Sequence, residues 1–322
     1  MMGYSSFRAA SWNVNGLNNP VKRSKVMAKI KKGKNQIIFL QETHLSQSEH
    51  EKLRKFGYRN IFYSSFKKGH KRGVAILLHN SIHFELVKEI RDSEGRYILV
   101  QGKIEDQMTT LLSVYLLPQS DPKLFKKVLE LIASESQGTL ICAGDFNTVI
   151  NRLDTSNNKR MISPQTKILR RGLEEIGLLD VWRDLHPTEK TYTYFSAPHT
   201  VYSRIDFFFI FRNDRHRIQS CDIGTRDISD HSPLYLTLCL DSRPKKTNWR
   251  LNTSLLNKET VVQQVKAEIQ DFLRINDNGE VNPNILWDTL KAVVRGKLIS
   301  LSAAMKKAKE NRLNQLEKNW VN

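Results

Sequence analysis

The stretch Thr139-Leu140-Ile141-Cys142-Ala143-Gly144-Asp145-Phe146-Asn147 joins a run of apolar residues to a carboxylate and an amide. The apolar run is typical of a buried β-strand, which would carry the polar pair to one edge of a sheet. Carboxylates and amides placed there can bind a hard cation through oxygen, take a proton from water and hold a phosphate oxygen. The stretch therefore indicates a sheet whose edge carries a metal-dependent site for phosphodiester cleavage.

Four further segments carry a carboxylate or an amide in a similar setting, and most of them follow strand-like runs. They are residues 11–16, 39–43, 202–206 and 229–233. Each segment alone is weak evidence, because Asx-rich turns and surface polarity give similar composition. Five such segments in one chain favour a common site over surface polarity.

The order of these motifs resembles the exonuclease III and AP-endonuclease-like nucleases of the endonuclease/exonuclease/phosphatase superfamily. Within that superfamily the chain looks most like the endonuclease domain of LINE-type (non-LTR) retrotransposon polyproteins. The resemblance runs from Asn13 to His231. Residues 248–252, 284–289 and 294–297 resemble the segment that joins endonuclease to reverse transcriptase in the same polyproteins.

The resemblance implies an α/β fold: a four-layer, DNase I-like sandwich of two β-sheets flanked by helices. Recurrent strand-like runs agree with it, and so do helices predicted after Asp121-Pro122 and Ser163-Pro164, where a capping side chain precedes proline. A charged break near residues 241–247 ends this pattern. We expect a nuclease domain in residues 1–240 and a basic helical linker in residues 241–322, with helices at 260–275, 285–301 and 302–320.

The resemblance assigns a role to each candidate residue. The catalytic residues would be Tyr115, Asp145, Asn147, Asp206 and His231. The substrate-binding residues would be Asn13, Thr193 and Arg204, with Arg204 on a rim that faces DNA. The metal ligands would be Asn13, Glu42, Asp145, Asn147, Asp230 and His231, around Mg²⁺, for which Mn²⁺ can substitute.

The residues themselves leave some alternatives open. Glu42 follows a buried strand, but it could instead cap or pair with the helix predicted at residues 46–55. Asp145 and Asn147 are two apart, which on an extended chain puts both side chains on one side, yet the same residues suit an Asx turn. A lone histidine such as His231 is more often a satisfied structural residue, and Tyr115 by pattern alone belongs to the core.

Charge points to an anionic partner. The chain has 322 residues and a formal net charge of +18. Both parts are basic, and residues 241–322 hold 15 Lys and Arg against 9 Asp and Glu. Such a surface attracts phosphate backbones. We expect a monomer that binds double-stranded DNA, and element RNA through its basic tail.

Localisation follows from weaker signals. Three cysteines, Cys142, Cys221 and Cys239, form an odd set that favours reduced thiols of an intracellular protein. Residues 1–8 lack a signal-peptide core, and no apolar run of about 18 residues occurs. We therefore expect no membrane attachment. Action on DNA would place the protein in the nucleus.

The predicted reaction is hydrolysis of a DNA phosphodiester to 3′-hydroxyl and 5′-phosphate ends, as the resemblance implies, for retrotransposition. A repair nuclease of the AP endonuclease or exonuclease III type would share the catalytic residues; Asn15, where repair enzymes often carry Asp, and the tail argue against it. A phosphatase or sphingomyelinase of the superfamily fits a +18 chain less well. A catalytically decayed, nucleic-acid-binding remnant is the alternative from another class.

Overall fold

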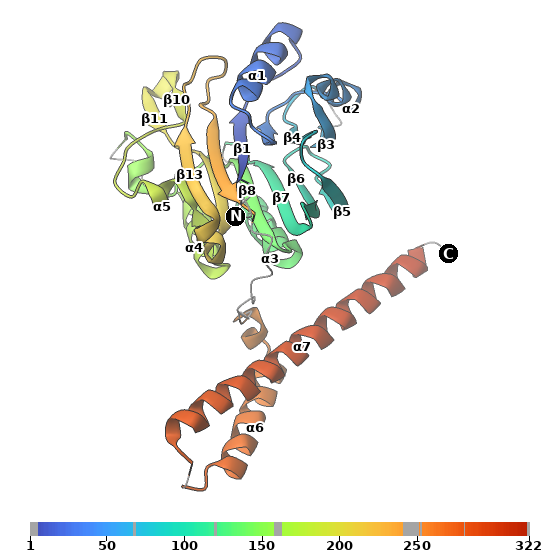
Figure 1. Cartoon of the computed structure of the whole chain (residues 1–322), viewed down its shortest axis with the longest axis vertical. Helices are drawn as coiled ribbons and strands as arrows, with labels where there is room; N and C mark the ends of the chain where they lie inside the picture. The colour runs from blue at the N-terminus through green and yellow to red at the C-terminus, as the bar shows by residue number, and fades with distance from the viewer. Residues whose placement is uncertain are drawn as a thin grey trace, which may run out of the picture. The chain divides into compact units, whose positions relative to one another are not determined.

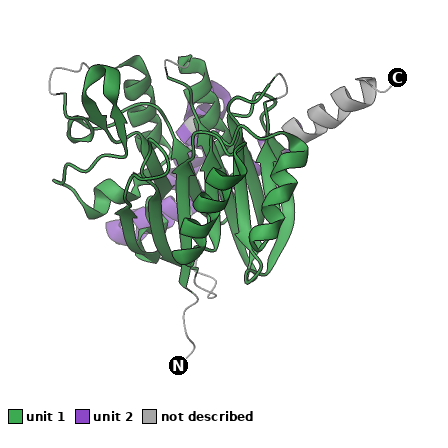
Figure 2. Ribbon diagram, turned by 90° about the horizontal axis from the view of Figure 1, so that it is seen from above, with its two compact units in different colours: residues 1–243 green, residues 244–322 purple. Residues whose placement is uncertain are grey.

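The computed structural model of the chain describes residues 6–66, 69–118, 121–157, 163–240, 251, 253–279 and 281–320. It divides into two compact units, residues 1–243 and 244–322 (Figure 2). The division expected from sequence, after residue 240, lies close to this point. The charged break at residues 241–247 falls outside the described residues.

Unit 1 contains two six-stranded sheets (Figure 1). In the first sheet the strand order is β13-β14-β1-β2-β4-β3, and in the second it is β5-β6-β7-β8-β12-β9. The first sheet comprises β1 (Ser6–Asn13), β2 (Ile37–Gln41), β3 (Tyr58–Ser64), β4 (Val74–His79), β13 (Ile218–Ile223) and β14 (Leu234–Cys239). The second comprises β5 (Phe84–Arg91), β6 (Tyr97–Ile104), β7 (Gln107–Tyr115), β8 (Thr139–Asp145), β9 (Leu178–Asp180) and β12 (Asp206–Phe211). A separate hairpin is formed by β10 (Tyr194–Ser196) and β11 (Val201–Ser203).

Apolar side chains fill three layers, one between the sheets and one on each outer face. In β2, Phe39 packs between the sheets with Phe208 of β12, whereas Ile38 and Leu40 pack beneath α1 (Pro20–Lys32). Alternate strand residues point to opposite faces, so a strand covered on both sides reads as a continuous apolar run. The outer face of the second sheet is covered by α3 (Pro122–Glu135) and α4 (Pro164–Glu175). The predicted four-layer sandwich is therefore confirmed.

The predicted helix starts are confirmed as well. The Asp121 carboxylate accepts a hydrogen bond from the N–H of Lys123 at the start of α3, and the Ser163 hydroxyl accepts one from Thr166 in α4. Between β2 and β3 the predicted single helix is instead α2 (Gln47–His50) followed by a 3-10 helix (Glu51–Phe56), which ends at Gly57 with φ of 97°. The short helix α5 (Val181–Leu185) follows β9.

Unit 2 consists of a 3-10 turn (Thr253–Asn257), α6 (Glu259–Asn276) and α7 (Pro283–Trp320). Leu255, Val261 and Leu298 form its small buried core. The two helices predicted at residues 285–301 and 302–320 are one continuous helix, because the junction has no glycine or proline to break it. In the described part of the chain, no helix combines the length and apolar character needed to cross a membrane.

Candidate active site

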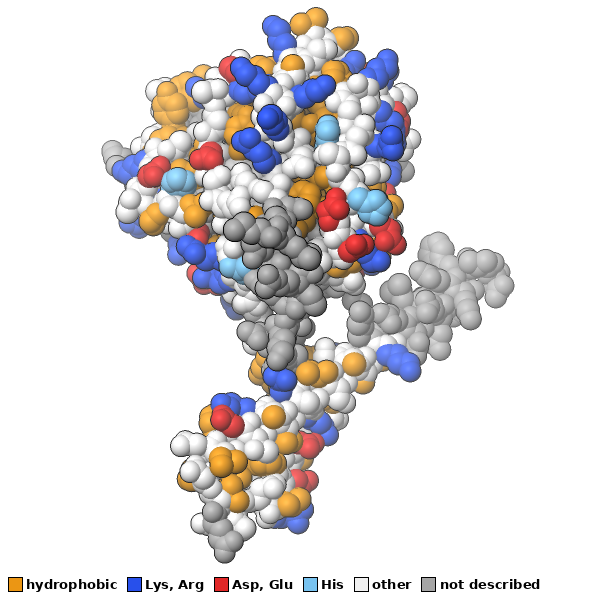
Figure 3. All heavy atoms as spheres, viewed as in Figure 1, with side chains coloured by type: hydrophobic (Ala, Val, Ile, Leu, Met, Phe, Trp, Pro, Cys, Tyr) orange, Lys and Arg blue, Asp and Glu red, His pale blue; other side chains and the backbone are white. Residues whose placement is uncertain are grey.

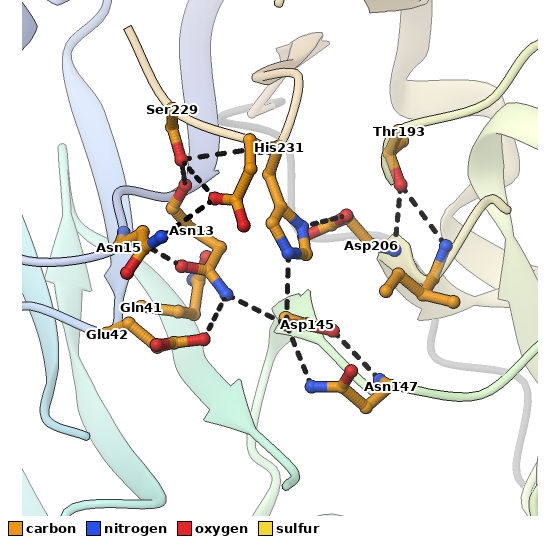
Figure 4. Close-up of polar contacts among 12 residues, drawn as sticks. Asn13, Asn15, Gln41, Glu42, Asp145, Asn147, Thr193, Asp206, Ser229 and His231 are labelled. Carbon is orange, nitrogen blue, oxygen red and sulfur yellow. Dashed lines mark hydrogen bonds and ion pairs between the residues drawn. The ribbon is translucent and has the colours of Figure 1, made fainter. Parts of the chain in front are cut away.

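Four strand ends meet at one edge of the sandwich. β1 ends at Asn13, β8 ends at Asp145 and β12 begins at Asp206, while Glu42 directly follows β2. β1 and β2 are parallel neighbours in one sheet, and Asp206 pairs with Asp145 in the other. His231 joins them from the segment before β14, so residues distant in sequence converge on one cluster (Figure 4).

Asn13 connects the two sheets at the centre of this cluster. Its amide nitrogen donates hydrogen bonds to Glu42 Oε1 at 2.8 Å and to Asp145 Oδ2 at 2.9 Å. Its amide oxygen accepts the backbone N–H of Asn15 at 3.0 Å. The side chain is fully buried, so these bonds fix the separation of the two carboxylates.

His231 and Asp206 form a buried hydrogen-bonded pair. Nδ1 of His231 lies 2.9 Å from Asp206 Oδ2, and Nε2 lies 3.8 Å from Asp145 Oδ2. The carboxylate of Asp206 thus favours the tautomer with its proton on Nδ1 and directs Nε2 toward Asp145. The indole N–H of Trp12 donates to the His231 carbonyl at 2.9 Å and anchors its backbone.

Burial and charge shift the pKa values of His231 and of the neighbouring Asp145. Burial disfavours the charged imidazole, but the carboxylates of Asp206 and Asp145 outweigh it and raise the pKa of His231 to about 10. Burial also raises the pKa of Asp145, and the negative charge of Asp206 raises it further. Strongly shifted pKa values of two neighbouring groups in one buried cluster are typical of acid–base sites.

The structure corrects the prediction that the chain is extended from Asp145 to Asn147. The chain is not extended there: β8 ends at Asp145, and Asn147 has a left-handed φ of 47°. The turn is closed by the Asn147 N–H, which donates to Asp145 Oδ1 at 2.8 Å. Its side-chain amide nevertheless donates to Asp145 Oδ2 at 3.0 Å and to the Leu116 carbonyl at 2.7 Å. The residue is therefore both an Asx turn and a part of the cluster.

Tyr115 and Glu42 are neighbours on the other side of Asn13. The Tyr115 hydroxyl contributes to lowering the pKa of Glu42, and Tyr115 is 6 % exposed. Burial opposes ionisation of Glu42, but hydrogen bonds from His44, Asn13 and Tyr115 hold its pKa below the usual value. Glu42 is therefore a carboxylate at neutral pH, and the alternative that it merely caps the next helix is wrong, since Ser46 caps α2.

Asp230 lies at the solvent-facing side of the cluster. Its Oδ1 accepts the Ser229 hydroxyl at 3.1 Å and the Asn15 amide at 3.2 Å. The side chain is exposed, in contrast to the buried His231 beside it. Asn15 thus contributes to the site by orienting Asp230.

Arg204 does not lie on a DNA-facing rim. Its side chain is fully buried and forms ion pairs with Asp180 at 2.6 Å and Asp154 at 2.9 Å. Arg183 also forms an ion pair with Asp154, at 2.6 Å, so two positive charges are balanced by two negative ones. The substrate-binding prediction for Arg204 is wrong, because a buried guanidinium with satisfied partners cannot contact a phosphate. No sequence signal linked it to acids 24 and 50 residues away.

Thr193 is brought near the cluster but faces the protein backbone. It is 1 % exposed, and its hydroxyl accepts the N–H of Ile205 at 3.2 Å and that of Asp206 at 3.4 Å. The structure therefore gives no support to the prediction that Thr193 contacts the substrate directly.

Gln41 and Ser229 lie in the predicted motifs but were given no role. Gln41 is buried and donates to Ser113 at 3.2 Å, which joins the two sheets behind the cluster. Ser229 donates to the Asn13 carbonyl at 2.8 Å. Their place in the motifs was the available signal, since the residue types alone are common.

The sequence pattern of the endonuclease/exonuclease/phosphatase family matches residues 10–231, which include every residue of the cluster. The chain belongs to this family. Membership confirms the predicted enzyme class, a metal-dependent nuclease.

Two known proteins are similar to most of this chain. A transposon TX1 uncharacterized 149 kDa protein from Xenopus laevis is 28 % identical over 286 residues, which are 87 % of this chain and 22 % of that protein. The chain thus spans about a fifth of that relative's length. An exodeoxyribonuclease from Bacillus subtilis is 25 % identical over 251 residues, 71 % of this chain and 98 % of the enzyme.

The fold is similar to that of solved structures. The AP endonuclease from Leishmania major superposes with a TM-score of 0.60 at 19 % identity, covering 73 % of this chain and 88 % of that chain. At this identity the likeness concerns the fold.

The family depends on divalent metal, and the residues present fit a hard cation. Around Asn13 the site offers the carboxylates of Glu42, Asp145 and Asp230, which are oxygen donors of the kind that Mg²⁺ and Mn²⁺ prefer. Asp145, Asp206 and His231 also lie close enough to hold an ion together. We do not assign the cation to these three residues. His231 Nδ1 and Asp206 Oδ2 are already hydrogen-bonded to each other, which explains why the groups lie close together.

Proposed function

We propose that the chain is a Mg²⁺-dependent endonuclease that hydrolyses one phosphodiester of duplex DNA and leaves 3′-hydroxyl and 5′-phosphate ends. One observation carries the proposal. The amide of Asn13 holds Glu42 and Asp145 together at 2.8 and 2.9 Å, beside the His231–Asp206 pair. Oxygen donors for a cation and an acid–base group are thereby combined around one residue, as hydrolysis of a phosphodiester requires.

In this proposal Asp145 accepts the proton of the attacking water. Burial strengthens it as a base, because a raised pKa increases its affinity for a proton. His231, kept charged by Asp206, binds a phosphate oxygen through Nε2 and stabilises the charge that develops there. Asn147 orients Asp145, and Tyr115 orients Glu42. A cation bound at Glu42 and Asp230 would supply further neutralisation of that charge.

Duplex DNA is the proposed substrate, and charge supports it. α1 carries Lys22, Arg23, Lys25, Lys29, Lys31 and Lys32 and no acidic residue. Lys and Arg side chains gather around α1 on the face shown in Figure 3. Basic side chains of this kind contact DNA phosphates and position the duplex without reading its base sequence.

The biological role that we propose is nicking of target DNA for retrotransposition. The support is the similarity to a transposon protein over 87 % of this chain. We further propose that the protein acts in the nucleus, as a monomer, and that the basic residues of unit 2 bind the element's RNA. The alternative role is repair of abasic sites, which the similarity to the fold of an AP endonuclease suggests.

A nicking assay on supercoiled plasmid with Mg²⁺ tests the activity. We expect Asp145→Asn to lower the rate about 10²-fold or more through loss of the base, with DNA affinity retained. The matched control is Asp106→Asn, an exposed turn residue between β6 and β7 with φ of 66°, which should nick at the wild-type rate. Full activity of Asp145→Asn would remove Asp145 from the mechanism.

The same assay on intact and abasic oligonucleotide duplexes separates the two roles. We expect both substrates to be cleaved at comparable rates. A strong preference for the abasic duplex would favour the repair role. Absence of nicking in the wild-type protein, with folding confirmed, would support the decayed remnant.

A further inference from the structure

Thr193 is hydrogen-bonded to both segments that carry the His231–Asp206 pair. Its hydroxyl accepts the N–H groups of Ile205 and Asp206 at 3.2 and 3.4 Å. Its carbonyl accepts the N–H of Ser232, the residue after His231, at 2.7 Å. The next residue, Tyr194, forms a β-bridge with His231 itself. One residue thus connects the segments that carry both members of the pair; Figure 4 shows the bonds of its hydroxyl on the side of Asp206.

Asp206 needs support of this kind because its carboxylate is held on one side only. Oδ2 bonds to His231 at 2.9 Å, whereas Oδ1 is buried without a hydrogen-bond partner among the described residues. The direction of the carboxylate is therefore set by the backbone from which it projects. That backbone is fixed by pairing with Asp145 of β8 and by the two N–H groups that bond to Thr193.

The geometry argues against a contact between Thr193 and substrate. The residue is 1 % exposed, and its hydroxyl oxygen is directed to two backbone N–H groups. Its own N–H donates to the Ser203 carbonyl at 3.0 Å, so the main chain is also engaged. A group used in this way acts on the reaction only through the residues it holds.

We infer that Thr193 is a positioning residue that keeps Asp206 and His231 in register, rather than a residue that binds DNA. The inference rests on the proposed function for its kinetic consequence, but its structural content concerns the pair alone. A displacement of about 1 Å between catalytic groups can cost on the order of 10²-fold in rate. Loss of the Thr193 hydroxyl should therefore appear in kcat.

The kinetic test compares Thr193→Val with Thr193→Ser in the full chain. Valine keeps the branched shape and removes the acceptor, whereas serine keeps the acceptor. We expect valine to lower kcat by roughly 10²-fold with KM and DNA affinity within about twofold of wild type, and serine to restore most of the rate. Thr110→Val is the matched control. Thr110 is also buried, and its hydroxyl accepts the N–H of Gln137 at 2.9 Å. This residue lies on β7, away from the end of the strand that reaches the candidate site.

A second measurement does not depend on activity. The proton between His231 and Asp206 should give a downfield ¹H resonance in NMR, assigned by its loss in His231→Gln. We expect Thr193→Val to shift or broaden this resonance and both Thr193→Ser and Thr110→Val to preserve it. If the wild-type protein does not cleave DNA, the proposed function fails while this measurement still decides the inference.

Several results would overturn the inference. A valine variant with normal kcat and weakened DNA binding would make Thr193 a substrate contact. A valine variant that matches Thr110→Val in rate and resonance would leave Thr193 without a role in the pair. If valine prevents folding, Thr193→Ala takes its place, and an unchanged kcat and resonance in that variant would equally contradict us.

Discussion

His50 shows at the scale of one residue how the fold keeps an ionisable group neutral. The ring is fully buried and stacks on Tyr63 with 4.5 Å between ring centroids. Nε2 lies 3.0 Å from the Thr43 hydroxyl and Nδ1 lies 3.0 Å from the Ser46 carbonyl. Both nitrogens are therefore satisfied without a charge. Burial lowers the pKa of His50 to about 4, below its usual value of 6.5.

This shift predicts acid destabilisation with a defined range. A base whose pKa is lower in the folded state stabilises the fold above its unfolded pKa and loses that contribution as pH falls through the folded one. Stability should thus decline between pH 6.5 and 4, by at most roughly 3 kcal/mol from this residue. Urea unfolding of wild type and His50→Gln at several pH values measures it. A free-energy difference between the two proteins that does not change with pH would contradict the prediction.

Arg204 shows where a single residue defeats sequence reasoning. It stands beside Asp206 in a motif that resembles a nuclease site, so exposure on the DNA side was the natural prediction. Its burial depends on Asp154 and Asp180, which come from other elements and carry no motif of their own. Asn147 is the opposite case: the residue was assigned to the site, while its left-handed φ of 47° was foreseen only as the turn alternative.

At the scale of elements, Arg204 fixes the link between β11 and β12. Its guanidinium lies between the rings of Trp182 and Phe207, at 5.0 and 4.6 Å from their centroids. Its N–H donates to the Asp154 carbonyl at 2.8 Å. The start of β12, and with it Asp206, is thereby tied to β9 and α5 through Asp180.

Removal of this link should be costly. Arg204→Met leaves the buried carboxylate of Asp154 and the partly buried carboxylate of Asp180 with only Arg183 to balance them, so we expect a loss of about 3–5 kcal/mol in the free energy of unfolding. The control is Arg215→Met, because the Arg215 side chain is 60 % exposed in its ion pair with Asp184, with an expected cost below about 1 kcal/mol. Chemical denaturation of the three proteins measures both values. Equal stability of Arg204→Met and wild type would mean that the buried charges are dispensable.

Elements were predictable where one local signal sufficed. Helices α3 and α4 begin at a capping side chain followed by proline, and the long apolar strands alternate between two cores. The three-residue strands β9, β10 and β11 were not predicted, because three residues are too few to show an alternating pattern; β9 pairs with β12, and β10 and β11 pair with each other. The strand β13 was not predicted either. The site could be predicted as a cluster of strand ends, but its internal hydrogen bonds could not.

At the scale of the molecule, the candidate site and the basic tail belong to different units. Every residue of the cluster lies between Asn13 and His231, within unit 1. Unit 2 has its own buried core of Leu255, Val261 and Leu298. Residues 241–322 also carry a net charge of +6, from 15 Lys and Arg against 9 Asp and Glu. Catalysis and part of the electrostatic binding should therefore be separable.

We predict that residues 1–240 alone fold and nick DNA with Mg²⁺, at a rate close to that of the full chain when DNA is saturating. Affinity should fall and depend less on salt, because log affinity changes with log salt in proportion to the phosphates neutralised, with a slope of about 0.9 for each. Titration of both proteins with duplex DNA at several salt concentrations measures the change. Equal slopes would mean that the tail does not contact DNA. A folded but inactive short protein at saturating DNA would place residues after 240 in the catalytic unit.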